Sequence, residues 1–355
     1  MTDPVPTPEH LELARSVRQL LERRSDSRAV RSAMAGPVGF DTALWSTLCD
    51  QLGVAALAVP EECGGAGFTA AETHVVLEEL GRALTPSPLL ASVVTSAVLV
   101  AAGGADDLLE RIAAGAVATL AWSGTTDTVA ATVGVRHADG RLSGSVAPVL
   151  NGDAAEILLV AAHHDDGVGL FEVDPAAPGV HLERVSGMDP TSGFATLDLE
   201  GAPARLVAAD ATAALAAAHR AGTLATTALA SGCARRGLDM TVGYTQQREQ
   251  FGRPLASFQA LKHRMADLLV LVQVTQAGAW AAVQAVVHDT PDADRLVASA
   301  ASYAKDAVTA VAAETVQLHG GIAITWEHDA HLVFKRAQAL NQLFGLPHHH
   351  RAALV

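Results

Sequence analysis

Two segments in the last third of the chain carry residue types that suit the binding of a dinucleotide. The first, YTQQREQFGRPLASFQALKHRMADL at 244–268, contains an arginine whose planar fork can satisfy phosphate oxygens with charge-assisted bonds. The second, QLHGGIAITWEHDAHLVFKRA at 317–337, contains a glycine pair that lets backbone approach a ligand closely. Each is weak taken singly, because either string can simply end a helix.

Few other side chains suit catalysis or metal binding. Glu327 is the most tempting carboxylate and Glu249 follows the arginine, but we interpret both as supporting or solvated groups. His263 and Asp267 are four residues apart on one expected helix, so they share a face and predict a structural pair. The adjacent histidines at 348–350 do not converge on one metal and have no cysteine or carboxylate cluster beside them, so we predict no metal site.

The elements that must position these residues change in type along the chain. Apolar spacing predicts helices over 8–35, 42–52, 70–84 and 89–102. Short apolar runs separated by turn residues then predict strands, and long helices follow over 210–247, 258–287 and 295–319. The expected fold class is α+β, with an N-terminal helical domain (1–117), a middle antiparallel β domain (118–207) and a C-terminal four-helix-bundle domain (208–355).

Composition narrows the classes of partner. The formal net charge of -14 repels phosphate backbones and anionic lipid, so nucleic acid and membrane surfaces are poor candidates. The N-terminal residues have no basic segment followed by an apolar core, as a signal peptide would. The apolar runs are interrupted before the length of about 18 residues that a membrane span needs. We therefore expect a cytoplasmic protein.

Taken together, the two segments resemble the acyl-CoA dehydrogenase family in their order and spacing. The loop VPEECGGAGFT at 59–69 is similar to the N-terminal domain of that family, and the α–β–α layout agrees. The resemblance covers essentially the whole chain. Within the family, the sequence looks most like the shorter actinobacterial subunits of heteromeric (α2β2) enzymes that act on bulky acyl-CoA thioesters.

The resemblance implies FAD as cofactor, an acyl-CoA as substrate and an electron-transfer flavoprotein as electron acceptor. Arg248 matches the family arginine that contacts the FAD pyrophosphate, and Gln250 and Phe251 match neighbours that touch the cofactor. Gln317 with the Gly320–Gly321 pair matches the second cofactor-binding turn. In the family this surface reaches FAD seated mainly on a neighbouring subunit, so these positions imply an oligomer.

The family reaction needs a carboxylate base, and neither of its two known locations contains one here. The first location is a Glu typically followed by Gly, and in ALNQLFGLPHHH at 339–350 it is Phe344 that precedes Gly345. The second lies on the first helix of the C-terminal domain, where HRAGTLATTAL at 219–229 has Gly222 near the expected place. We therefore assign no catalytic residue.

The middle segment also departs from the family pattern for seating the flavin ring. In WSGTTDTVAA at 122–131 only Ser123 stands for the family threonine. In GSVAPVLNG at 144–152, Pro148 and Leu150 occupy the places of a tryptophan and a threonine. Only Gly144, Asn151 and Gly152 remain similar in that run.

These losses indicate one subunit of a heteromeric FAD-dependent acyl-CoA dehydrogenase, whose paralogous partner supplies the flavin cradle and the catalytic Glu. Two alternatives stay open. One is a self-sufficient homo-oligomeric dehydrogenase with an unrecognised base. The other is a non-redox protein in which the fold serves a regulatory or scaffolding role.

Overall fold

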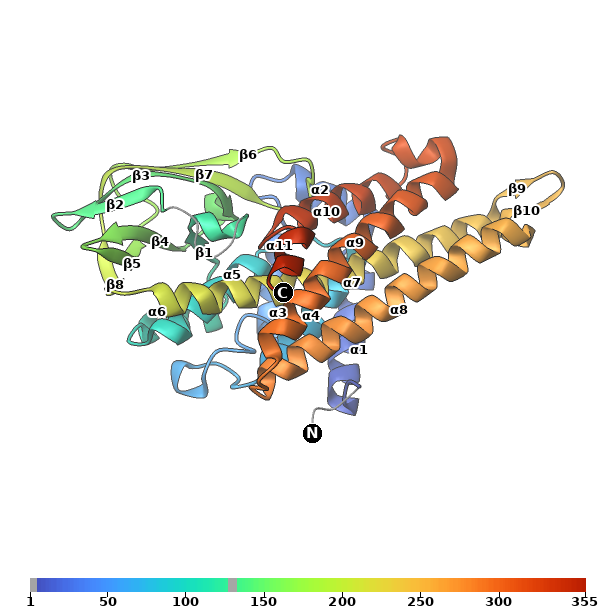
Figure 1. The fold of residues 1–355 in the computed structure, drawn as a ribbon. Coiled ribbons are helices and arrows are strands. Elements are labelled where there is room, and N and C mark those ends of the chain that lie inside the picture. The colour runs from blue at the N-terminus through green and yellow to red at the C-terminus, as the bar shows by residue number, and fades with distance from the viewer. Residues whose placement is uncertain (1–4, 127–132) are drawn as a thin grey trace.

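The computed structural model of the chain describes residues 5–126 and 133–355, and its first part is helical (Figure 1). Side chains define the helix starts: Asp41 accepts hydrogen bonds from the backbone of Ala43 and Leu44, and Thr69 and Glu72 form a capping box. The helices are α1 (Pro8–Arg24), α2 (Ser27–Ala35), α3 (Thr42–Leu52), α4 (Ala70–Ala83), α5 (Leu89–Ala102) and α6 (Asp106–Ala113).

The single helix expected over 8–35 is two helices, α1 and α2. The break falls at Ser25 and Asp26, where the Asp26 carboxylate accepts a hydrogen bond from the Ala29 N–H at 2.8 Å. A short acidic side chain can end one helix by capping the start of the next. The Asp26 bond therefore explains why the single expected helix is broken here.

The middle part is an eight-stranded sheet in the order β6-β7-β3-β2-β4-β5-β8, with β1 beside β4. Alternate residues of β4 face opposite sides: Leu159 and Ala161 join the core shared with the helices, whereas Leu158 and Val160 join a second core. The strands are β1 (Ala118–Ala121), β2 (Val135–Ala138), β3 (Arg141–Leu150), β4 (Ile157–His164), β5 (Gly167–Val173), β6 (Val180–Val185), β7 (Phe194–Pro203) and β8 (Arg205–Ala208).

The sheet is mixed, which corrects the prediction that it is purely antiparallel. β4 runs parallel to β1, with Ala118 opposite Ile157, and parallel to β2, with Arg136 opposite His163. The hairpin of β2 and β3 separates β1 from β4 in the chain, so the two are not joined by a tight turn that would force them antiparallel. The turn-residue spacing in the sequence reveals hairpins but not such crossovers.

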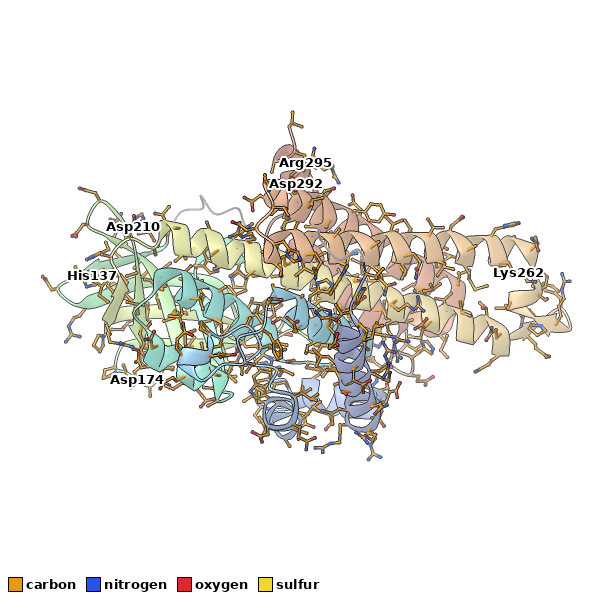
Figure 2. All side chains as sticks on the ribbon, turned by 90° about the horizontal axis from the view of Figure 1, so that it is seen from below. His137, Asp174, Asp210, Lys262, Asp292 and Arg295 are labelled. Atoms are coloured by element: carbon orange, nitrogen blue, oxygen red, sulfur yellow. The ribbon has the colours of Figure 1, made fainter. Side chains whose placement is uncertain are left out.

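The last part is built around one long helix. α7 (Thr212–Gln247) runs from the sheet to a two-stranded hairpin at the opposite end, where it meets α8 (Gln259–Val287) (Figure 1). In Figure 2, Asp210 lies at the sheet end and Lys262 near the hairpin end. At 1.5 Å per residue, 36 residues span about 54 Å. α9 (Ala293–His319) and α10 (Ala330–Gln342) complete four long helices, and the short α11 (Pro347–Ala352) follows.

α4 and α7 approach closely through glycine. A Cβ added at Gly232 of α7 would lie 1.9 Å from the carbonyl oxygen of Glu78 on α4, and one at Gly81 would lie 2.4 Å from the carbonyl oxygen of Leu229. Any side chain at these two positions would push the helices apart. These contacts fix the N-terminal helices against the helix that carries the candidate site.

α8 and the stretch from α9 through the turn after it (Ala293–Ile324) are long and apolar enough to cross a membrane on length and composition alone. This corrects the expectation that every apolar run is too short, because the few charges in these helices lower their hydropathy very little. In the structure 44% of the most apolar window of each is buried. Both helices pack against α7 and against each other, as core helices of a bundle do.

Candidate functional site

The first predicted segment forms a turn at the end of α7. The Arg248 N–H donates to the Tyr244 carbonyl at 2.8 Å and so ends the helix. A hairpin of β9 (Glu249–Gln250) and β10 (Arg253–Pro254) follows, turned by Phe251 and Gly252, both with positive φ. Arg248 and Gln250 are exposed, and the Phe251 side chain is 92% exposed.

The second predicted segment lies where α9 ends. His319 is the last residue of the helix, and Gly320 leaves it with a φ of 64°. A Cβ added at Gly320 or Gly321 would meet nothing within 4 Å. Gln317 is exposed beside this turn. The backbone here is therefore open to whatever approaches it from outside the chain.

Ring stacking brings the two segments together. The rings of Tyr244, one turn before Arg248, and His319, directly before Gly320, stack with centroids 4.5 Å apart and planes at 28°. An ion pair of 2.6 Å between Arg264 of α8 and Glu314 of α9 joins the same ends of the helices. The stacking fixes the relative orientation of two segments that are far apart in the sequence.

The exposed surface fits a phosphate-bearing cofactor that lies outside this chain. The Arg248 guanidinium is exposed and forms no ion pair within the described ranges, so its fork is available to an external anion. The turn at Gly320 offers backbone without obstructing side chains. According to the family resemblance, Arg248 would contact the FAD pyrophosphate and the Gly320–Gly321 pair would form the second cofactor-binding turn.

Gly222 and Phe344, which the resemblance matches to the two family positions for the base, lie at one place. A Cβ added at Gly222 of α7 would lie 2.3 Å from Cε1 of Phe344, so the phenyl ring fills the space that a side chain at Gly222 would need. Phe344 is fully buried, and its N–H donates to the carbonyl of Thr125 at 2.8 Å. A buried apolar ring thus fills this space, and neither of the two residues is a carboxylate.

Basic groups lie behind that ring. Lys305 of α9 is 1% exposed, and its Nζ donates to the carbonyls of Leu343 and Gly345 on either side of Phe344. Burial lowers the pKa of Lys305 to about 7. Burial, with the charges of Lys305 and His219, lowers the pKa of His350 to about 4. These groups hold the turn in place and supply no carboxylate.

The middle-domain residues that the resemblance compares with flavin-seating positions make contacts within the chain. Leu150 is 5% exposed, and its carbonyl accepts a hydrogen bond from Thr119 at 2.5 Å. Asn151 is buried against Gly193, where an added Cβ would lie 2.3 Å from the amide nitrogen. Pro148 follows a cis peptide bond. Residues 127–131 of the other candidate strand lie outside the described residues.

The remaining candidates lie apart from that place. Glu249 is on the exposed hairpin, and Glu327 is on the exposed stretch before α10. The predicted pair of His263 and Asp267 is wrong, because the His263 ring pairs with Gln259 on the preceding turn at 3.2 Å. Within residues 5–126 and 133–355, no three His, Cys, Asp or Glu side chains gather where they could hold a metal ion.

Sequence reasoning missed two features of this region. One is the buried Lys305, whose sequence signal is a single cation among the apolar positions of α9. The other is a cavity of about 280 Å³ between α4, α5 and α7, lined mostly by alanine, valine and leucine. No local pattern marks the cavity, because its wall combines segments from the beginning and the middle of the chain.

Comparisons with known proteins agree with this architecture. Residues 7–118 match the family described as acyl-CoA dehydrogenase, N-terminal domain, and residues 205–352 match acyl-CoA dehydrogenase, C-terminal domain. The chain is 39% identical over 348 residues to Acyl-CoA dehydrogenase IpdE2 of Mycolicibacterium smegmatis, with 96% of each chain covered.

Two solved structures are also similar. One, titled the Tcur3481-Tcur3483 steroid ACAD G363A variant, has a TM-score of 0.87 at 30% identity and covers 98% of this chain and 96% of that one. The other, the ChsE4-ChsE5 complex from Mycobacterium tuberculosis, has a TM-score of 0.88 at 29% identity, with 99% and 97% covered. With both family domains matched in order, this chain belongs to the acyl-CoA dehydrogenase family of FAD-dependent oxidoreductases.

Proposed function

We propose that this chain is one subunit of a heteromeric acyl-CoA dehydrogenase. A paralogous partner would supply the flavin cradle and the catalytic Glu, in an α2β2 assembly. This chain would lend Arg248, Gln250, Phe251, Gln317, Gly320 and Gly321 to the FAD of the partner. The enzyme would desaturate a bulky acyl-CoA thioester of lipid or sterol metabolism in the cytoplasm and pass electrons to an electron-transfer flavoprotein.

The single observation that carries the proposal is the contact between Gly222 and Phe344. Both family positions for the base converge there, and the phenyl ring leaves 2.3 Å to an added Cβ. A base in this reaction must reach the α-proton of the substrate directly. With a buried ring in that place, this chain has no carboxylate at either family position.

The exposed binding surface supports the second half of the proposal. Phe251 is 92% exposed at the tip of the hairpin, close in sequence to the exposed Arg248 guanidinium. Such an exposed apolar ring is explained if another molecule covers it. The titles of two similar solved structures each name a pair of proteins, ChsE4-ChsE5 and Tcur3481-Tcur3483. A pairing of unlike subunits is therefore consistent with the fold.

The residues of this chain would bind FAD and orient it. FAD, when bound, supplies the acceptor for the hydride that leaves the β-carbon of the substrate. The Arg248 fork would hold pyrophosphate oxygens with charge-assisted bonds. The glycine turn would let its backbone approach the cofactor, and Phe251 would cover apolar cofactor surface from water. The α-proton would pass to the Glu of the partner.

Co-expression with paralogous acyl-CoA dehydrogenase genes tests the proposal. We expect the isolated chain to be colourless, and the complex to have a 2:2 mass by native mass spectrometry with one flavin per pair of unlike subunits. Replacing the catalytic Glu of the partner should abolish acyl-CoA oxidation while flavin stays bound. An isolated chain that carries one FAD and oxidises acyl-CoA would overturn the proposal, and the absence of flavin with every partner would favour a non-redox role.

A further inference from the structure

The loop between β6 and β7 meets both helical parts of the chain at one buried place. Thr191 of this loop is 3% exposed, and Arg336 of α10 is 5% exposed. Thr85, in the turn after α4, is 1% exposed. All three residues line one small cavity of about 30 Å³. The first helices, the sheet and the last helices therefore border the same space.

The guanidinium of Arg336 reaches the other two parts directly. Its Nη1 donates a hydrogen bond to Thr191 Oγ1 at 2.8 Å and lies 3.5 Å from the carbonyl oxygen of Thr85. Thr85 is in turn joined to Ser25, the residue after α1, because their hydroxyl oxygens are 2.8 Å apart. One side chain of α10 thus contacts both the loop of the sheet and the helical part that begins the chain.

The same Thr191 hydroxyl also contacts a buried carboxylate. Asp189 is fully buried, and its Oδ1 accepts hydrogen bonds from the Thr191 hydroxyl at 2.7 Å and from the Thr191 N–H at 2.9 Å. The Ser192 hydroxyl donates to the other oxygen, Oδ2, at 2.6 Å. The Thr191 hydroxyl therefore bridges a buried carboxylate of the loop and a buried guanidinium of α10.

These two partners fix the direction of the hydroxyl. A guanidinium only donates hydrogen bonds, and an ionised carboxylate only accepts them. The Thr191 hydroxyl therefore gives its proton to Asp189 and accepts the N–H of Arg336 with a lone pair. Valine has nearly the same shape as threonine but can do neither. Because a buried charged group that loses a hydrogen-bond partner is costly, both contacts depend on this one hydroxyl.

We propose that the hydrogen-bonded chain of Arg336, Thr191 and Asp189 is a latch that fixes the sheet against both helical parts, and that the Thr191 hydroxyl closes it. Without the hydroxyl, the loop between β6 and β7 separates from α10 more often, and the contact of Arg336 with the turn after α4 loosens with it. The latch lies within one chain and requires neither FAD nor a partner subunit. The inference is therefore independent of the proposed function.

Amide hydrogen exchange of the full chain, measured by mass spectrometry, tests the latch in the variant Thr191→Val. We expect exchange to become about 10- to 100-fold faster, the factor expected when a buried polar group loses its partner. The increase should appear in three segments that belong to three parts of the fold: residues 186–193, residues 334–342 of α10 and residues 81–90 around the turn after α4.

Ser192→Ala is the matched control, because it also removes one hydroxyl that donates to Asp189 but leaves the contact between Thr191 and Arg336 in place. Exchange should become faster in residues 186–193 alone. Thr191→Ser keeps a hydroxyl and should restore the exchange of the wild type in all three segments.

Arg336→Met provides a second route to the same result, because it removes the guanidinium that Thr191→Val would leave without its partner. It should speed exchange in the same three segments, and adding Thr191→Val to it should change only residues 186–193 further. Faster exchange confined to residues 186–193 in Thr191→Val, or no change at all, would overturn the latch. So would the three-segment pattern in Ser192→Ala.

Discussion

At the scale of single residues, Gly222 and Phe344 pack against each other in the buried core. The two residues belong to α7 and to the turn after α10, and each is unremarkable in its own segment. Together they fill one space, because the phenyl ring lies where a Cβ on Gly222 would be. This part of the core is therefore filled by the phenyl ring and is not an empty site.

The first prediction concerns this contact. Gly222→Ala should destabilise the chain by about 1–3 kcal/mol in urea unfolding, because the added methyl overpacks the core against Phe344. Gly243→Ala is the control on the same helix, where an added Cβ meets nothing, and it should stabilise by about 0.5–1 kcal/mol. Adding Phe344→Leu to Gly222→Ala should cost less than the sum of the two single changes, and strict additivity would contradict the contact.

The second prediction concerns Arg248. Arg248→Ala should weaken flavin retention by the co-expressed complex about 10- to 100-fold, since one charge-assisted hydrogen bond contributes about 1.5–3 kcal/mol. Arg248→Lys should recover only part of the loss, because an ammonium lacks the planar fork. Arg295→Ala is the control, an exposed arginine at the start of α9 far from the hairpin in Figure 2. Equal flavin occupancy in Arg248→Ala and wild type would remove the arginine from the binding surface.

At the scale of elements, turns between helices are held by buried polar groups. Lys305 joins α9 to the turn after α10 through two carbonyls, and the imidazole of His350 on α11 is buried near the same turn. The stacked rings of Tyr244 and His319 join the ends of α7 and α9. Each of these contacts joins elements that are far apart in the sequence, so no short-range sequence pattern predicts the contact.

The third prediction follows from the pKa of His350, which burial and the charges of Lys305 and His219 lower from 6.5 to about 4. Between these values the unfolded chain binds a proton at His350 that the folded chain does not. The free energy of unfolding should therefore fall as the pH drops from 6.5 towards 4. Chemical denaturation of His350→Phe should show a shallower fall than wild type. His348→Phe, at an exposed position of the same helix, should keep the full slope.

The fourth prediction concerns the stacking that aligns the two cofactor segments. Tyr244→Leu should increase the flavin dissociation constant of the complex by up to about tenfold, because an aromatic pair contributes about 0.5–1.5 kcal/mol beyond its buried area. The control is Tyr303→Leu on the outer face of α9, where the ring is 37% exposed. Fluorimetry of released flavin measures both variants, and equal affinities would show that the stacking does not orient the site.

At the scale of the whole molecule, apolar side chains gather at exposed positions on the hairpin and on the turn before α10. Phe251 is 92% exposed, Ile324 is 77% exposed and Trp326 is 63% exposed. The sheet lies at the other end of α7 (Figure 1). Large apolar side chains that are this exposed are candidates for a surface that another molecule covers.

The fifth prediction is that assembly protects these two segments. Hydrogen exchange measured by mass spectrometry should slow in residues 248–254 and 320–326 when the partner subunit is added. Strand β6 at the far end serves as the internal control and should exchange at the same rate with and without the partner. Unchanged exchange in both segments would mean that the partner binds elsewhere.

The family resemblance and most of the expected helix bounds follow from local patterns in the sequence. The helices predicted over 42–52 and 89–102 are confirmed, because caps, glycines and apolar spacing act over a few residues. The absence of a carboxylate at Phe344 and Gly222 is likewise visible in the residues alone. Whether the exposed residues bind flavin stays a prediction.

How distant segments combine is visible only in the folded chain. It joined Gly222 to Phe344 and stacked Tyr244 on His319. It also made two strand pairings parallel. These contacts depend on volumes and directions set by the packing of whole elements, and neither propensity nor periodicity within one segment contains that information.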